Sequence, residues 1–79
     1  MTRTDIQTEI AKTLQTLTGR EIEVTVSESR ARGMFLSLCA DIAALDAARP
    51  VMAKVGNVRF SERSIDPDDD VQVDFYSIN

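Results

Sequence analysis

The residue types that carry most catalysis near neutral pH are scarce in this sequence. It contains no histidine and one cysteine, Cys39. Neither a Ser-His-Asp nor a Cys-His arrangement can be built, and Cys39 has no imidazole to activate its thiol. A single cysteine without histidine cannot form an internal disulfide or a zinc site, and three scattered glycines form no phosphate-binding loop. We predict a protein that is not an enzyme and uses no metal or cofactor.

The strongest local charge feature is a run of four aspartates: Asp66, Asp68, Asp69 and Asp70. Their spacing resembles the opening of a calcium-binding loop, but Val71 stands where that loop needs glycine and Ser77 where it needs a bidentate glutamate. Two interpretations stay open. The Asp-Pro-Asp-Asp sequence is ordinary turn chemistry that keeps a small protein soluble. Alternatively, the clustered carboxylates mimic a nucleic-acid backbone and dock onto an Arg/Lys surface, with electrostatic steering of the encounter.

Length and composition place the chain among small globular domains. Its 79 residues, 43% hydrophobic and 28% charged, suffice for one core, so we predict a single domain over residues 1–79. The net charge is -4, and five of the 13 acidic residues lie in the last 14 residues, which hold no Lys or Arg. Nucleic-acid binding draws on a basic surplus, so this balance favours a protein partner with a basic surface and no direct nucleic-acid contact. The N-terminus has no signal-like or membrane-spanning apolar run, which predicts a cytoplasmic protein without membrane contact.

Hydrophobic periodicity predicts two helices and four strands. In chain order they cover residues 4–17 (helix), 21–27 and 34–38 (strands), 42–55 (helix), and 58–63 and 71–77 (strands). Thr4 and Gln7 are predicted to form a capping box on the first helix, and Asp41 is predicted to cap the second. The apolar stripes of the two helices, which include Leu17 and Ile42, should face the core.

Pro50 lies inside the second helical pattern. Proline removes a backbone donor and costs about 3 kcal/mol in a helix interior. Apolar residues nevertheless continue at helical spacing to Met52 and Val55. The helix is therefore expected either to kink at Pro50 or to end near Ala48.

The element order α-β-β-α-β-β predicts an α+β two-layer sandwich. Each helix has one apolar stripe and each strand pair one apolar side, so the simplest arrangement is a four-stranded antiparallel sheet with two helices on one face. Joining the termini would turn the order into βαββαβ, so a circularly permuted relative of the ferredoxin-like sandwich is the candidate topology. The other face of the sheet would then be open to solvent.

Function is expected on this open face, with the acidic run as a second candidate surface. Alternation places two aromatic residues there, Phe35 and Tyr76, amid mixed charge, which is typical of an interface hot spot. The alternative is that both rings merely pack on a loop or on the aliphatic stems of neighbouring arginines. The residues that alternation places on the open face are Glu21, Glu23, Phe35, Arg59, Arg63, Asp74 and Tyr76, and all of them except Glu21 are predicted to bind the partner.

The whole chain resembles the small anti-CRISPR proteins that phages and mobile elements use against bacterial defence. The resemblance is one of format: the 79-residue length, a compact α/β core, the absence of a catalytic residue set and the acidic run from Asp66 to Asp70. It implies a phage-encoded inhibitor in the host cytoplasm that binds type I surveillance complex subunits and blocks target-DNA binding. It assigns no functional residue, because these families share no signature.

Two other functions stay open. An open antiparallel sheet with aromatic and arginine side chains is superficially similar to an RNA-recognition domain, although the charge balance and the missing Gly-Phe-basic motif count against it. The second is a small assembly subunit that pairs through an exposed edge or face. In solution we expect a monomer or a weak dimer.

Overall fold

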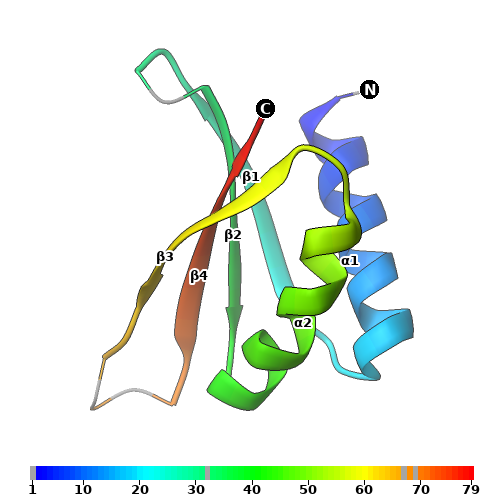
Figure 1. The fold of residues 1–79 in the computed structure, drawn as a ribbon, viewed down its shortest axis with the longest axis vertical. Helices are drawn as coiled ribbons and strands as arrows, with labels where there is room; N and C mark the ends of the chain where they lie inside the picture. The colour runs from blue at the N-terminus through cyan, green and yellow to red at the C-terminus, as the bar shows by residue number, and fades with distance from the viewer. Residues whose placement is uncertain (1, 32, 67, 69) are drawn as a thin grey trace.

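The computed structural model describes residues 2–31, 33–66, 68 and 70–79. It contains two helices and four strands in the predicted order (Figure 1). Their bounds are α1 Arg3–Thr18, β1 Glu23–Ser29, β2 Gly33–Ala40, α2 Ile42–Lys54, β3 Val58–Ser64 and β4 Gln72–Ile78. Every predicted element is present, and no boundary differs from its predicted position by more than two residues.

The four strands form one antiparallel sheet in the order β1-β2-β4-β3, with both helices on the same face (Figure 1). In a chain with joined termini, α1 would connect β4 to β1 with β2 between them, and α2 connects β2 to β3 with β4 between them. These are two split β-α-β units, the pattern of the ferredoxin-like sandwich. The N- and C-termini lie at the same end of the molecule (Figure 1). Strand order and chain ends therefore both fit a circular permutation of that fold.

The first helix begins one residue earlier than predicted, because Thr2 caps it. The Thr2 hydroxyl accepts a hydrogen bond from the Asp5 N–H, and the Asp5 carboxylate accepts one from the Thr2 N–H, each at 3.2 Å. The predicted Thr4–Gln7 capping box is wrong. The Gln7 side-chain oxygen instead accepts a hydrogen bond from the Val26 N–H of β1 at 3.2 Å. This bond occupies a donor on the outer edge of β1 with which another strand could otherwise pair.

The second helix continues past Pro50 to Lys54, so an end near Ala48 is wrong. The Asp41 carboxylate accepts a hydrogen bond from the Ala44 N–H at 2.7 Å, which confirms the predicted cap. Ala48 and Met52 are buried on either side of the proline in the sequence. Their packing offsets the backbone hydrogen bond that Pro50 cannot donate.

The core lies between the helices and one face of the sheet. Its buried apolar residues are Ile10, Leu14, Ile22, Val24, Val26, Leu36, Leu38, Ala44, Leu45, Ala48, Met52 and Tyr76. Two residues predicted for the core are exposed instead, Leu17 at 63% and Ile42 at 45%. Leu17 lies in the last turn of α1 and Ile42 is the first residue of α2, so both are at helix ends.

Candidate functional site

The candidate site is the sheet face that carries no helix. Residues directly opposed in an antiparallel ladder share a face, so the register identifies its outward side chains. The two central strands supply Phe35, Ser37 and Cys39 from β2 and Val73, Phe75 and Ser77 from β4, all half-buried. The two edge strands supply Glu23, Thr25 and Ser27 from β1 and Arg59, Glu62 and Ser64 from β3. These twelve residues are called the open face below.

Two phenylalanines form the apolar centre of the open face. Phe35 lies opposite Ser77 and Phe75 lies opposite Ser37, so the two rings are diagonal neighbours across the central strand pair. They line a depression of about 550 Å³ together with Ser61, Glu62, Tyr76 and Ser77. Of the described chain, no helix covers this face (Figure 1).

The open-face predictions for Phe35, Glu23 and Arg59 are confirmed by the register. Glu21 is exposed but precedes β1, so it lies beside the face and not on it. Phe75 was missed, because the prediction that Asp74 and Tyr76 face outward leaves Phe75 on the opposite side of the strand. The alternation of this strand was recognised correctly, but its phase was reversed.

Tyr76, Asp74 and Arg63 point to the helix side of the sheet, so their prediction for the open face is wrong. Tyr76 is opposite the core residue Leu36, and it is 3% exposed. Asp74 is 0% exposed and lies between Leu38 on one side and Arg63 on the other. In the first part of β4, Val73 and Phe75 therefore face outward while Gln72 and Asp74 are buried, which reverses the usual pattern of a half-buried strand.

An ion-pair network explains how an aspartate is accommodated in the core. The Arg63 guanidinium donates to both carboxylate oxygens of Asp74, from Nε at 2.6 Å and from Nη2 at 3.1 Å. Arg63 Nη2 also donates to Asp46 Oδ1 of α2 at 2.8 Å. Hydrogen bonds to Asp74 and then to Asp46 raise the pKa of Arg63 above its ordinary value, so the guanidinium stays charged. Arg63 and Asp74 carry opposite charges and face each other across β3 and β4. These opposite charges were the signal in the sequence for the network.

The Tyr76 hydroxyl is buried and forms no hydrogen bond with the described part of the chain. The ring contacts Phe60 edge-on, with centroids 5.4 Å apart, and the Arg49 guanidinium lies 4.2 Å above the Phe60 ring. Burial raises the pKa of Tyr76 to about 12, and the negative charge of nearby Asp74 adds to the rise. The neutral phenol is therefore the form that the core accepts.

This burial predicts a loss of stability at high pH. The phenol of the unfolded chain ionises near pH 10, whereas the folded protein holds its proton until about pH 12. The folded state binds more protons between these values, so the free energy of unfolding should fall as the pH rises, by about 2 to 3 kcal/mol. Urea unfolding from pH 8 to pH 11.5, compared between wild type and Tyr76→Phe, isolates this effect because lysines are common to both. Tyr76→Phe should also be about 1 kcal/mol more stable at pH 8, since it removes an unpaired buried hydroxyl. Equal pH dependence of the two proteins would contradict the assignment.

The acidic turn is built around Gln72, the first residue of β4. The Gln72 side chain accepts a hydrogen bond from the Asp66 N–H at 2.9 Å and donates one to the Asp66 carbonyl at 3.1 Å. The Asp66 carboxylate accepts from the Asp68 N–H at 3.0 Å. Asp66, Asp68 and Asp70 are exposed, whereas Asp69 lies outside the described residues. The turn is at the end of the molecule opposite the chain termini (Figure 1).

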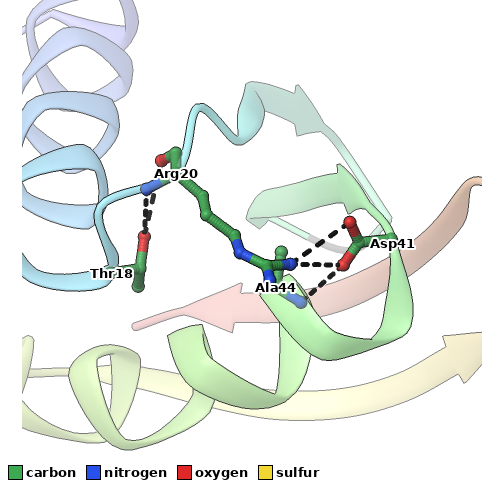
Figure 2. A network of polar contacts seen from close by, with 4 residues as sticks. All are labelled: Thr18, Arg20, Asp41 and Ala44. Carbon is green, nitrogen blue, oxygen red and sulfur yellow. Dashed lines mark hydrogen bonds and ion pairs between the residues drawn. The ribbon is translucent and has the colours of Figure 1, made fainter.

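A second polar network lies at this same end and joins the end of α1 to the start of α2 (Figure 2). Arg20 Nη1 donates to both Asp41 oxygens, at 3.0 and 3.3 Å, while Asp41 caps α2. The Arg20 N–H donates to the Thr18 hydroxyl at 3.3 Å. Arg20 and Arg63 are thus both paired with carboxylates.

No protein-family model, curated protein or solved structure matches the chain. Among the described residues, no three His, Cys, Asp or Glu side chains are grouped so as to hold a metal ion. Neither described helix is long and apolar enough to cross a membrane.

Proposed function

We propose that this chain is a non-enzymatic protein-binding domain that docks a partner on its open face. The observation that supports this proposal is the diagonal pair Phe35 and Phe75 at the centre of an uncovered sheet. Aromatic side chains bury a large area at low entropic cost, and they dominate binding energy when a partner excludes water from them. Serines beside the rings and charged residues on the edge strands provide the polar rim usual for such interfaces.

The charge distribution supports a partner with a basic surface. Four exposed carboxylates lie at the end of the sheet where β1 and β4 begin, and we call them the acidic end: Glu23, Asp66, Asp68 and Asp70. Because Arg20 and Arg63 are already paired, they do not cancel this charge for an incoming partner. A Lys/Arg surface beside an apolar patch would match the acidic end and the phenylalanine pair together.

As the specific partner we take the type I surveillance complex implied by the anti-CRISPR resemblance, which needs such a basic surface to hold DNA. The test is a gel shift of target DNA by purified complex, with the protein added first. Loss of the shifted band supports an inhibitor of DNA binding. Lys12→Ala, a substitution at an exposed position of α1, is the control and should inhibit as strongly as the wild type. A full DNA shift without co-migration of the protein on the complex would reject this partner.

The acidic end should act mainly on the rate of association. Replacing Asp68 and Asp70 with asparagine is expected to slow association several-fold at low salt and to leave dissociation nearly unchanged, because exposed charges steer encounters. Surface-immobilised complex and stopped flow at two salt concentrations measure this effect. Glu9→Gln/Glu28→Gln is the matched control, since it also removes two exposed carboxylates, one on α1 and one near the opposite end of β1 from Glu23. An unaltered association rate would make the turn plain solvent surface.

A second candidate function is binding of single-stranded RNA. The observation in its favour is that Phe35 and Phe75 stand on the two central strands of an open sheet, where bases could stack on them. Of the two arginines predicted for the open face, only Arg59 lies on it, because Arg63 is held by Asp74 on the helix side. A salt-sensitive RNA shift at low salt would support this function, and the absence of any shift would remove it.

A further inference from the structure

The open face is complementary to itself. We propose that the open faces of two copies pack together, related by a two-fold axis that lies between the sheets and runs perpendicular to the strands. The inference shares with the proposed function only the premise that the open face is a docking surface. It adds a regulation of that surface, because a second copy and the partner protein would compete for it.

Large and small side chains alternate on the two central strands of the open face. Along β2 the outward residues are Phe35 and then Ser37, and along β4 they are Ser77 and then Phe75. A two-fold axis between these two rows places each phenylalanine over a serine of the other copy. Facing sheets lie about 10 Å apart, so large side chains must alternate with small ones across the gap. The phenylalanine rings of the two copies would interdigitate without meeting head-on.

Charge selects the direction of the axis. Arg59 and Glu62 are the outward charges of β3, one in each of the two central rows, and both are exposed. Neither belongs to an ion pair with a described residue. The perpendicular axis places Arg59 of each copy over Glu62 of the other, which forms two symmetric pairs. An axis parallel to the strands would bring the acidic ends of the two copies together, which like charges oppose.

The edges of the sheet are poor alternatives for self-association. On the free edge of β1, the Val26 N–H already donates a hydrogen bond to the Gln7 side chain of α1. On β3 the register shifts at a bulge between Phe60 and Glu62, which disrupts an edge for pairing. The open face is therefore a larger and more regular surface for self-association than either edge of the sheet.

The footprint of the open face is small, which limits the affinity of a dimer formed through it. Four strands about 4.8 Å apart and seven residues of about 3.3 Å each give a footprint of roughly 440 Å². Such a footprint is at the small end of specific interfaces, so we expect a weak and concentration-dependent dimer. A partner that binds the phenylalanine pair more tightly would displace the second copy.

A charge swap tests both the contact and its axis. Sedimentation equilibrium should show a monomer–dimer equilibrium for the wild type, and Arg59→Glu or Glu62→Arg alone should weaken it about tenfold or more, because each change creates like-charge pairs. The double variant Arg59→Glu/Glu62→Arg should recover association close to that of the wild type. Lys12→Glu on α1 is the control for a changed net charge and should leave the equilibrium unaltered.

Three outcomes would overturn the proposal. They are a wild-type monomer at all concentrations up to the solubility limit, single variants that associate like the wild type, and a double variant that stays monomeric. None of these outcomes touches the proposed function, which is measured by the DNA gel shift at concentrations where the protein is monomeric. Conversely, if the charge swap gives the expected result but the protein has no effect on the surveillance complex, the dimer is supported and the proposed function is not.

Discussion

Replacing Arg63 with leucine should destabilise the protein by about 3 to 5 kcal/mol, since it leaves the carboxylate of Asp74 buried without a countercharge. Asp74 is 0% exposed and receives two hydrogen bonds from Arg63. A chain of 79 residues has a total stability of roughly 4 to 12 kcal/mol. The loss is therefore a large share of the whole, and unfolding in urea followed by far-UV circular dichroism would measure it.

A matched control separates burial from the loss of an arginine. Arg59→Leu removes an arginine from the same strand, but Arg59 is exposed on the open face, so its cost should stay within about 0.5 kcal/mol. The double variant Arg63→Leu/Asp74→Leu should recover much of the lost stability, because an apolar pair needs no countercharge. A cost for Arg63→Leu as small as that of Arg59→Leu would show that the network does not bury its charge as described.

Replacing Phe35 and Phe75 together with alanine should weaken partner binding by at least about 100-fold, since hot-spot aromatics contribute 2 kcal/mol or more each. Both rings are only half-buried on an uncovered face, so the cost to folding should be about 1 to 2 kcal/mol and the double variant should stay folded. Titration of the variant against the surveillance complex, with circular dichroism of the free protein, gives both quantities.

Phe60→Ala is the matched control for this double variant. Phe60 is 39% exposed but lies on the helix side of the sheet, against Tyr76 and beneath Arg49. It should therefore bind the partner as the wild type does. Tyr76 is unsuitable as an interface probe, since Tyr76→Ala would remove a buried ring at a cost of about 3 to 5 kcal/mol. Wild-type affinity of the Phe35/Phe75 variant would clear the open face of a role.

Local signals in the sequence were enough to predict the element order and the sheet, but not every residue assignment. Alternation in β1 and β2 placed Val24, Val26, Leu36 and Leu38 correctly, because apolar residues occupy one side of β1 and the more apolar side of β2 is the buried one. Apolar spacing bounded both ends of α1 and the start of α2 to within one residue, although the capping box of α1 was assigned to the wrong residues. Pro50 was harder, because propensity argues for a break and only the tertiary packing of Met52 shows why α2 continues.

The phase of β4 could not be derived from its own residues. Both sides of the strand carry an aromatic residue, and the more apolar side, Val73 and Phe75, is the one that faces outward. What decides the phase is a long-range pairing of Arg63 with Asp74, which makes a buried aspartate acceptable. That pairing depends on strand register, and the bulge in β3 shifts the register by one residue. Val73 and Phe75, which face outward as a result of this pairing, are part of the candidate site.

Alkylation of Cys39 measures whether a bound partner covers the open face. Cys39 is the single cysteine of the chain and is half-buried on the open face opposite Val73. The rate of its reaction with a maleimide, followed by intact mass, would be measured with and without saturating surveillance complex. A partner seated on the open face should slow the reaction at least tenfold, with no slowing for the Phe35→Ala/Phe75→Ala variant. An unchanged rate in protein that co-migrates with the complex would show that the partner binds elsewhere on the molecule and leaves the open face uncovered.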